Sequence, residues 1–321
     1  MKLGVFDPVF GDANLAVALD RAVALGLEAV ELGAGGYPGN RRCDPAKLLA
    51  DRAELESFRR AFSERELTIS ALSCHGNPLH PDEAQARRDD EVFRNAVRVA
   101  AEVGVERINL FSGCPGDGPD ASLPNWVVCQ WPDDFAKILT WQWEEKVLPY
   151  WAEAGAFARH HGVRLGLEMH PGFVVYNPRT LLRVRNEVGD VIGANFDPSH
   201  LFWQGIDPLL AIRELGSAIF HVHAKDTIID PHNVARNGVL DLVDPADLEQ
   251  RPWYFRSVGD GHALDFWKDL VAALRLSGYD WVLSIEHEDR LASPQEGLGR
   301  AIETLRKAIL SQPVASPVVA I

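Results

Sequence analysis

Residues 191–226 read VIGANFDPSHLFWQGIDPLLAIRELGSAIFHVHAKD and contain one complete strand–helix–strand repeat. The apolar runs 192–196 and 219–223 have the length of buried strands. Between them, residues 208–215 carry apolar side chains at helical spacing and begin with a proline, which is favoured in the first turn of a helix. This order predicts two parallel strands joined by a helical crossover.

The same alternation extends along the whole chain and predicts eight strand–helix units. The strand candidates are residues 2–6, 29–32, 68–73, 107–111, 164–169, 192–196, 219–223 and 281–286. The helical candidates are residues 15–25, 45–64, 82–103, 134–161, 178–187, 208–215, 264–276 and 294–310. Glycines follow four of these helices, at the position where a left-handed backbone ends a helix: Gly26, Gly104, Gly162 and Gly278. Eight such units predict a single closed (β/α)8 TIM barrel.

An open, doubly wound sheet is the alternative fold for this pattern. It normally has a glycine-rich phosphate loop after its first strand, and residues 7–12 read DPVFGD instead. We therefore expect one barrel domain over residues 1–311, with long loops at 113–133 and 227–261 on the catalytic face. Residues 312–321 are expected to be a C-terminal extension.

Composition limits the function classes. The 321 residues include 32 bases and 46 acids, so the formal net charge is −14, which argues against binding to nucleic acid. No apolar run reaches the length of a membrane span, and Asp7 interrupts the segment where a signal peptide would be apolar. The four cysteines show no CxxC spacing, which predicts reduced thiols. We expect a cytoplasmic protein without membrane contact that acts on a small molecule.

Acids and histidines stand at the ends of four consecutive strand candidates, in the second half of the chain. Glu168, Asp197, His223 and Glu286 would meet at the C-terminal mouth of a barrel. Several carboxylates gathered there repel one another unless a cation compensates them. Three carboxylates and one imidazole suit one divalent ion, Mn²⁺ first and Mg²⁺, Co²⁺ or Zn²⁺ as alternatives.

Other residues near these strand ends have two readings. His221 shares a strand face with His223, and either a core position or a substrate contact fits it. Lys225 and Asp226 fit either substrate binding or a salt bridge within the loop. His287 points the other way and is expected to be structural. Trp203 lies in a strand-to-helix connection at the mouth, where an aromatic wall suits the C–H face of a sugar.

The strand-end motifs also carry a resemblance to a known family. The chain resembles the xylose isomerase-like barrel superfamily of sugar phosphate isomerases and epimerases, which also contains endonuclease IV. The motifs that carry it are LEMHPG, NFDPSH, HVHAKD, GDGHALDF and SIEHED. The resemblance places Glu168, Asp197, His223 and Glu286 at the four metal-ligand positions of the ketose 3-epimerases. It also makes Glu168 and Glu286 proton carriers and His200 a residue that contacts substrate or metal.

The sequence departs from two members of that superfamily. Val174 and Ile229 replace a glutamate and an arginine of the epimerases, so their substrate clamp is absent. Endonuclease IV uses extra histidines on its third and fourth strands. His75 fits the first of these, but the fourth strand is followed by Ser112, which leaves a trinuclear nuclease site incomplete.

The closest resemblance is to a bacterial subgroup described as sugar phosphate isomerase/epimerase. Its markers are CHGNPLHP, WQWEEKVLPYW, EMHPGFVVYNP and DPSHLFWQGIDP. Such proteins also resemble the catalytic subunit of C-glycoside deglycosidases, which act on 3-oxo-glycosides. Both activities remove a proton from a carbon beside a sugar carbonyl.

These observations lead to one main functional hypothesis and two alternatives. We expect a metal-dependent isomerase or epimerase of a keto sugar, with Glu168, Glu286 and His200 as catalytic residues. The alternatives are a lyase or C-glycoside deglycosidase acting on 3-oxo-glycosides, and a carbohydrate-binding protein without turnover. The expected assembly is a homo-oligomer, or a hetero-oligomer with a small subunit for a deglycosidase. The expected substrate-binding residues are His75, His170, His200, Trp203, Lys225 and Asp226.

Overall fold

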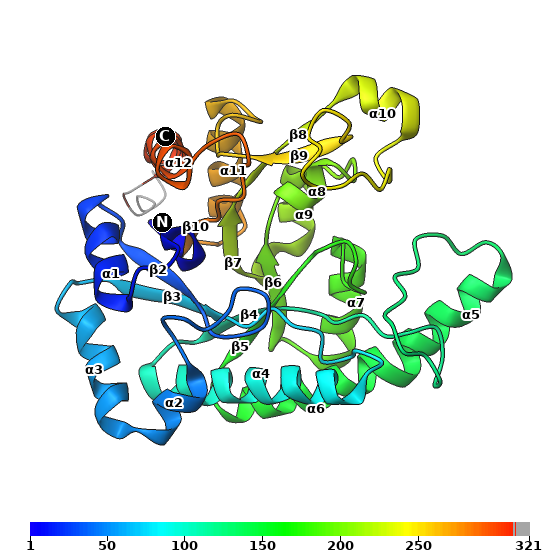
Figure 1. Ribbon diagram of the computed structural model, residues 1–321, viewed down its shortest axis with the longest axis horizontal. Helices are drawn as coiled ribbons and strands as arrows, with labels where there is room; N and C mark the ends of the chain where they lie inside the picture. The colour runs from blue at the N-terminus through cyan, green and yellow to red at the C-terminus, as the bar shows by residue number, and fades with distance from the viewer. Residues whose placement is uncertain (311, 313–321) are drawn as a thin grey trace, which may run out of the picture.

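Eight parallel strands close into a barrel in the computed structural model, which describes residues 1–310 and 312 (Figure 1). The strands are β1 (Lys2–Phe6), β2 (Ala29–Gly33), β3 (Thr68–Ser73), β4 (Arg107–Phe111), β5 (Arg164–Glu168), β6 (Ile192–Phe196), β7 (Ile219–Ala224) and β10 (Val282–Ile285). They pair in chain order, and β1 pairs with β10 to complete the ring. The predicted (β/α)8 barrel is confirmed. The proposed extension at 312–321 lies, apart from Gln312, outside the described residues.

Side chains alternate along each strand between the surrounding helices and the barrel interior. In β5, Leu165 and Leu167 belong to the apolar core, whereas Gly166 and Glu168 have the opposite parity. A Cβ atom on Gly166 would lie 2.9 Å from the side-chain oxygen of Asn109 on β4, so only glycine fits there. The barrel interior is therefore narrow and polar below its mouth.

Helices cover the outside of the barrel. The longer ones are α1 (Leu15–Ala24), α3 (Arg52–Ser63), α4 (Glu83–Val103), α5 (Asp133–Trp141), α6 (Leu148–His160), α7 (Pro178–Val188), α9 (Pro208–Leu215), α11 (Leu264–Leu276) and α12 (Pro294–Ala308). Shorter helices are α2 (Pro45–Ala50), α8 (Ser199–Phe202) and α10 (Pro231–Asn237). The four glycines predicted to end helices all have positive φ, from 66° at Gly26 to 87° at Gly278.

Two predicted helices are interrupted. The segment 45–64 divides into α2 and α3 because Asp51 takes an extended backbone and its side chain accepts hydrogen bonds from the Ala53 and Glu54 amides. The segment 134–161 contains a π-helical turn, Gln142–Val147, between α5 and α6. There the Gln142 amide donates to backbone carbonyls of the 113–133 loop, including that of Gly116 at 2.9 Å. Both differences involve local side-chain hydrogen bonds, which the spacing of apolar residues along the sequence does not reveal.

The two long connections on the catalytic face differ in structure. Residues 112–132, all of them described, contain no helix or strand and lead into α5, which projects from the barrel (Figure 1). The connection 227–261, expected to be a loop, instead contains α10 and most of a two-stranded antiparallel sheet formed by β8 (Asp226–Ile229) and β9 (Trp253–Arg256). This sheet lies next to the barrel mouth, and its strand β9 lines a cavity there together with His170 and His200.

Two further observations concern the environment of the chain. None of the helices in the described part of the chain has both the length and the apolar character that a membrane crossing requires. All four cysteines are free thiols; Cys43, Cys74 and Cys114 are buried and Cys129 is exposed.

Candidate metal centre and active site

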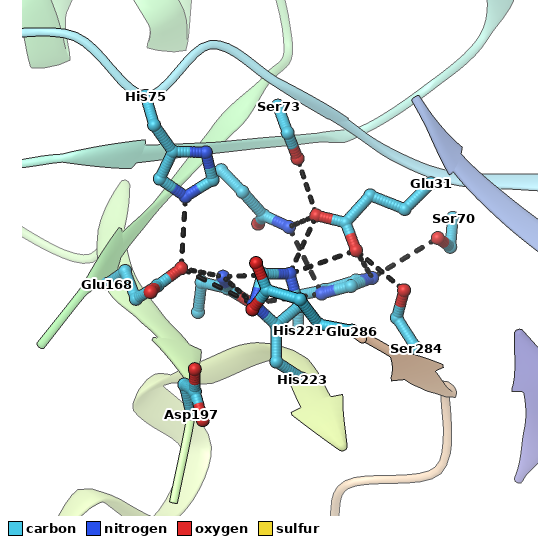
Figure 2. Close-up of polar contacts among 12 residues, drawn as sticks. Glu31, Ser70, Ser73, His75, Glu168, Asp197, His221, His223, Ser284 and Glu286 are labelled. Atoms are coloured by element: carbon cyan, nitrogen blue, oxygen red, sulfur yellow. Dashed lines mark hydrogen bonds and ion pairs between the residues drawn. The ribbon is translucent and has the colours of Figure 1, made fainter. Parts of the chain in front are cut away.

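Four strand ends bring the four predicted ligand residues together at the barrel mouth. Glu168 ends β5, Asp197 follows β6, His223 lies near the end of β7, and Glu286 follows β10. One possible ligand atom from each residue lies within 4.8 Å of the others. Figure 2 shows these side chains converging from separate strands. The group can therefore hold a single metal ion.

Short contacts define the geometry of this cluster. The Nδ1 atom of His223 lies 3.0 Å from a Glu286 oxygen and 3.4 Å from a Glu168 oxygen. The Nε2 atom of His200 lies 3.3 Å from oxygens of both Glu168 and Asp197. Three of the four ligand residues are buried and Glu286 is partly buried, so the electrostatic interactions among them are weakly screened.

Asp197 tests whether this arrangement suits a cation. Its Oδ1 atom accepts a hydrogen bond from the Ser199 amide, but its buried Oδ2 atom has no hydrogen-bonding partner within the described residues. The facing Nε2 atom of His200 is also buried and has no hydrogen-bonding partner among the described residues. Burial raises the pKa of Asp197 by more than His200 and Lys225 lower it, although the Lys225 ammonium lies 3.7 Å from Oδ2; Glu168 and Glu286 raise it further. A cation at this position would supply the missing partner, so the residues fit a metal.

The other carboxylates of the cluster already have positive or hydrogen-bonding neighbours. Burial alone would raise the pKa of Glu168, but the His200 and His75 rings beside its carboxylate outweigh burial and hold that pKa well below its usual range. The pKa of Glu286 is lowered to about 2, because Lys225 and His223 outweigh its burial. Both glutamates are therefore ionised near neutral pH and available as metal ligands or proton acceptors.

Glu31 lies next to this cluster and is not among the site residues predicted from sequence. It lies on β2, is fully buried, and has its Oε1 atom 2.9 Å from Nε2 of His223. Ser73 and Ser284 also donate hydrogen bonds to its carboxylate (Figure 2). Asn109 donates a further one. Glu31 therefore contacts the Nε2 atom of His223, while the Nδ1 atom of the same ring faces Glu168 and Glu286. Glu31 could have been found from the sequence, because it is an acid near the end of the buried run AVEL, residues 29–32. Acids at strand ends were the criterion applied to the second half of the chain.

His221 belongs to the polar floor beneath the site. It is fully buried, its Nδ1 atom lies 3.0 Å from the Asn195 side-chain oxygen, and its Nε2 atom lies 3.2 Å from Ser70 Oγ. Burial lowers the pKa of His221 to about 4, so its ring is neutral. Of the two readings of this residue, its surroundings match the core position. His287 packs against Gly297 of α12 and lies at the rim of the cavity.

The predicted substrate-binding residues separate into two groups. His75, His170, His200 and Lys225 line a cavity of about 420 Å³ together with Glu168 and Glu286. His75 lies 3.0 Å from Glu168, and burial next to His200 lowers the pKa of His170 to about 3, so His170 is neutral. Lys225 is buried, with its ammonium 3.2 Å from Glu286 and in contact with Glu288.

Asp226 and Trp203 lie outside that cavity. The carboxylate of Asp226 is fully buried and accepts hydrogen bonds from the amides of Gly259, Gly261 and His262. Asp226 thus anchors the end of the 227–261 connection, and substrate contact by it stays a prediction. Trp203 follows α8 and lines a neighbouring cavity.

A model of the xylose isomerase-like TIM barrel family matches residues 19–308. The chain belongs to this family. A curated family relative, the uncharacterized protein YfiH of Bacillus subtilis (strain 168), is 37% identical over 313 residues, which cover 96% of this chain and 99% of YfiH. The resemblance drawn from the strand-end motifs is therefore confirmed.

Solved structures share the fold over nearly the whole chain. The 3-keto-D-glucoside 4-epimerase YcjR of E. coli has a TM-score of 0.65 at 17% identity and covers 96% of this chain and 99% of its own. The IOLI protein with a bound zinc atom has a TM-score of 0.63 at 20% identity and covers 96% of each chain. At these identities the likeness concerns the barrel fold.

Proposed function

We propose that this protein is a metal-dependent isomerase or epimerase of a keto sugar or a related carbohydrate. The observation that carries the proposal is the cluster of Glu168, Asp197, His223 and Glu286, in which a buried carboxylate oxygen of Asp197 has no hydrogen-bonding partner among the described residues. Membership of a family that includes sugar isomerases supports the same reading.

The donor set favours one divalent ion, with Mn²⁺ first and Mg²⁺, Co²⁺ or Zn²⁺ as alternatives. Three carboxylates and one imidazole form a mixed, largely oxygen set of the kind these ions accept. When bound, such an ion polarises a carbonyl and stabilises negative charge that develops on its oxygen. The IOLI structure, which shares this barrel fold, contains a bound zinc atom, which supports a metal-dependent reaction here.

The protein's own residues supply the proton transfers. Glu168 and Glu286 stand on β5 and after β10, which β6 and β7 separate around the barrel, so they reach a bound sugar from two directions. The pKa values of both glutamates are low, so both carboxylates begin ionised and can accept a proton. One glutamate removes the proton from the carbon beside the carbonyl and, now protonated, returns it to the neighbouring carbon. For epimerisation, the other glutamate first takes up a proton from solvent and delivers it to the opposite face of the same carbon.

Neighbouring side chains orient the sugar. His75 and His200 contact Glu168 and line the same cavity, which suits them to hydrogen bonds with sugar hydroxyls. Lys225 has a buried ammonium beside Glu286, and this positive charge would stabilise negative charge that develops on the nearby part of the substrate. His170, neutral at physiological pH, adds a further hydrogen-bonding group to the wall.

Hydrogen exchange tests the proposed function. The manganese-loaded protein is incubated in deuterated water with a panel of ketoses and 3-oxo-glucosides, and recovered sugars are analysed by NMR. We expect deuterium on the carbon beside the carbonyl, in an isomer of equal mass or in recovered substrate. Turnover without label would reject proton abstraction.

A lyase acting on 3-oxo-glycosides is the second candidate. One observation favours it: the cavity with the acidic cluster adjoins a second cavity, which leaves room for a leaving group attached to the sugar. The same base would act, followed by loss of the group rather than by reprotonation. Release of a free aglycone in the experiment above would identify this reaction.

A further inference from the structure

A second group of possible metal ligands lies beneath the mouth cluster, the name used here for the four predicted ligand residues. Glu31, His221 and His223 each offer one ligand atom, and these atoms lie within 4.8 Å of one another. All three residues are fully buried. We call them the lower triad, and it shares only His223 with the mouth cluster. Figure 2 shows the Glu31 carboxylate directed towards both imidazole rings.

The spacing of the ligand atoms suits a four-coordinate ion. The two carboxylate oxygens of Glu31 lie 2.9 and 3.0 Å from Nε2 of His223, and Oε2 lies 3.9 Å from Nε2 of His221. Zinc binds nitrogen and oxygen at about 2.0–2.2 Å, so two ligands of a tetrahedral zinc ion lie about 3.3 Å apart. The observed distances lie on both sides of that value, and small side-chain rotations would equalise them.

The hydrogen bonds of His221 leave the required nitrogen free. Its Nδ1 atom lies 3.0 Å from the Asn195 side-chain oxygen and donates its proton there. The amide nitrogen of Asn109, 3.1 Å from the same Nδ1 atom, donates to Glu31 at 2.8 Å. The Nε2 atom of His221 therefore carries a lone pair, and it faces Glu31 and the Ser70 hydroxyl, which lies 3.2 Å away.

Neighbouring donors hold the Glu31 carboxylate in this position. The hydroxyls of Ser73 and Ser284 and the amide of Asn109 donate to it from three other strands. A carboxylate oxygen has more than one lone pair, so these hydrogen bonds are compatible with a metal on the same group. Metal ligands in proteins are commonly oriented by such outer hydrogen bonds.

The charges inside the barrel favour a second cation. Glu31 and the three acids of the mouth cluster gather around one buried ammonium, that of Lys225. Glu288, the other acid in contact with Lys225, is exposed, so water screens it. One divalent ion at the mouth cluster leaves one negative charge in excess. A second ion that releases the Nε2 proton of His223 to solvent, and makes the ring a bridge between the ions, cancels this excess.

We propose that the lower triad is a structural zinc site, filled in addition to the mouth cluster. Two imidazole nitrogens and a carboxylate are a ligand set that zinc takes in proteins, whereas manganese favours oxygen ligands. Both oxygens of Glu31 complete four ligands, and the ion joins β2 to β7 inside the barrel. The site is separate from the proposed reaction, since no step of that reaction uses Glu31 or His221.

Equilibrium dialysis against zinc counts the sites. Protein freed of metal by a chelator is dialysed against zinc alone, and bound zinc is measured by elemental mass spectrometry. We expect about two zinc ions per wild-type chain and about one in His221→Gln, which loses an imidazole ligand. Asp197→Ala should keep the ion of the lower triad and also bind about one. His160→Ala, at an exposed histidine of α6, is the matched control and should match the wild type.

The outcomes decide the assignment without reference to sugar turnover. One zinc ion per wild-type chain, or two in folded His221→Gln, would overturn the zinc site. A lost ion in His160→Ala would also overturn it, because the loss would not be local. If His221→Gln does not fold, anomalous diffraction from zinc-soaked wild-type crystals decides. A zinc peak between Glu31 and His221 is expected, and its absence would refute the site.

Discussion

The carboxylate of Glu31 lies 2.9 Å from Nε2 of His223, on the opposite side of the imidazole from Glu286. Burial would lower the pKa of His223, but Glu31 and Glu286 raise it well above its ordinary value. With Nε2–H donated to Glu31, Nδ1 is the nitrogen available to a metal. A carboxylate behind a histidine ligand fixes the ring and its tautomer, and raises its basicity as a ligand.

Replacing Glu31 should therefore weaken metal binding although Glu31 is not a predicted ligand. In Glu31→Gln the amide cannot accept from Nε2–H as a carboxylate does, and we expect manganese affinity to fall by about 10- to 100-fold. Titration followed by electron paramagnetic resonance measures this change. Glu28→Gln, at an exposed glutamate preceding the same strand, is the control. An unchanged dissociation constant would remove Glu31 from the account.

Glutamine variants of Glu168 and Glu286 separate proton transfer from metal binding. Glutamine keeps an oxygen of similar position but loses basicity, so deuterium exchange into a true substrate should fall by roughly 10²-fold or more. Manganese content, measured on the same samples, should fall less. Glu296→Gln on the surface of α12 serves as the control. Exchange retained in both variants would assign the base to another residue, and His200 would be tested next.

The reactivity of the four thiols tests whether Cys43, Cys74 and Cys114 are buried. Burial raises the pKa of Cys74 and of Cys114 to about 12, and burial also raises the pKa of Cys43. The thiolate is the reactive form. We expect a disulfide reagent at pH 8 to modify one thiol per native chain, exposed Cys129, and four after denaturation. Rapid modification of two or more native thiols would contradict the described packing.

The raised pKa values of the buried thiols also make the free energy of unfolding depend on pH. The folded state holds these thiol protons more tightly than the unfolded chain, whose thiols have a pKa near 9.0. The free energy of unfolding should therefore decrease as pH rises from about 9 towards 12. Cys74→Ala, compared with wild type by denaturation at pH 8 and pH 10, should show a smaller decrease.

Nucleic acid should not be a substrate. The net charge is −14, and Ser112 after β4 accepts a hydrogen bond from the Val175 amide at 2.9 Å instead of supplying an imidazole. We expect a duplex with an apurinic site to be neither bound at physiological salt nor cut. Cleavage that disappears in Glu168→Gln would restore a nuclease reading.

Periodicity predicted the barrel because each strand–helix unit repeats one pattern, with helix ends marked by glycines. It did not predict the changes within the segments 45–64 and 134–161, since these depend on local hydrogen bonds that the Asp51 carboxylate accepts and the Gln142 amide donates. It also did not predict β9, because Trp253–Arg256 pairs with a strand distant in sequence.

The ligand cluster was predictable from sequence for a related reason. Residues at the C-terminal ends of barrel strands converge at the mouth, so Glu168, Asp197, His223 and Glu286 could be grouped without coordinates. Glu31 met the same strand-end criterion, but its partners Ser73, Asn109 and Ser284 lie on three other strands, so the sequence did not indicate its place behind His223. Only the closed barrel brings those donors to one carboxylate.

Manganese titration of the purified protein, freed of metal by a chelator, measures whether the four strand ends bind an ion. We expect one tight site per chain in the wild-type protein. We also expect affinity reduced at least about tenfold in both Asp197→Ala and His223→Ala, with folding checked by circular dichroism. Absence of any tight site in the folded wild-type protein, or equal affinity in both folded variants, would contradict the claim that these strand ends form a metal centre.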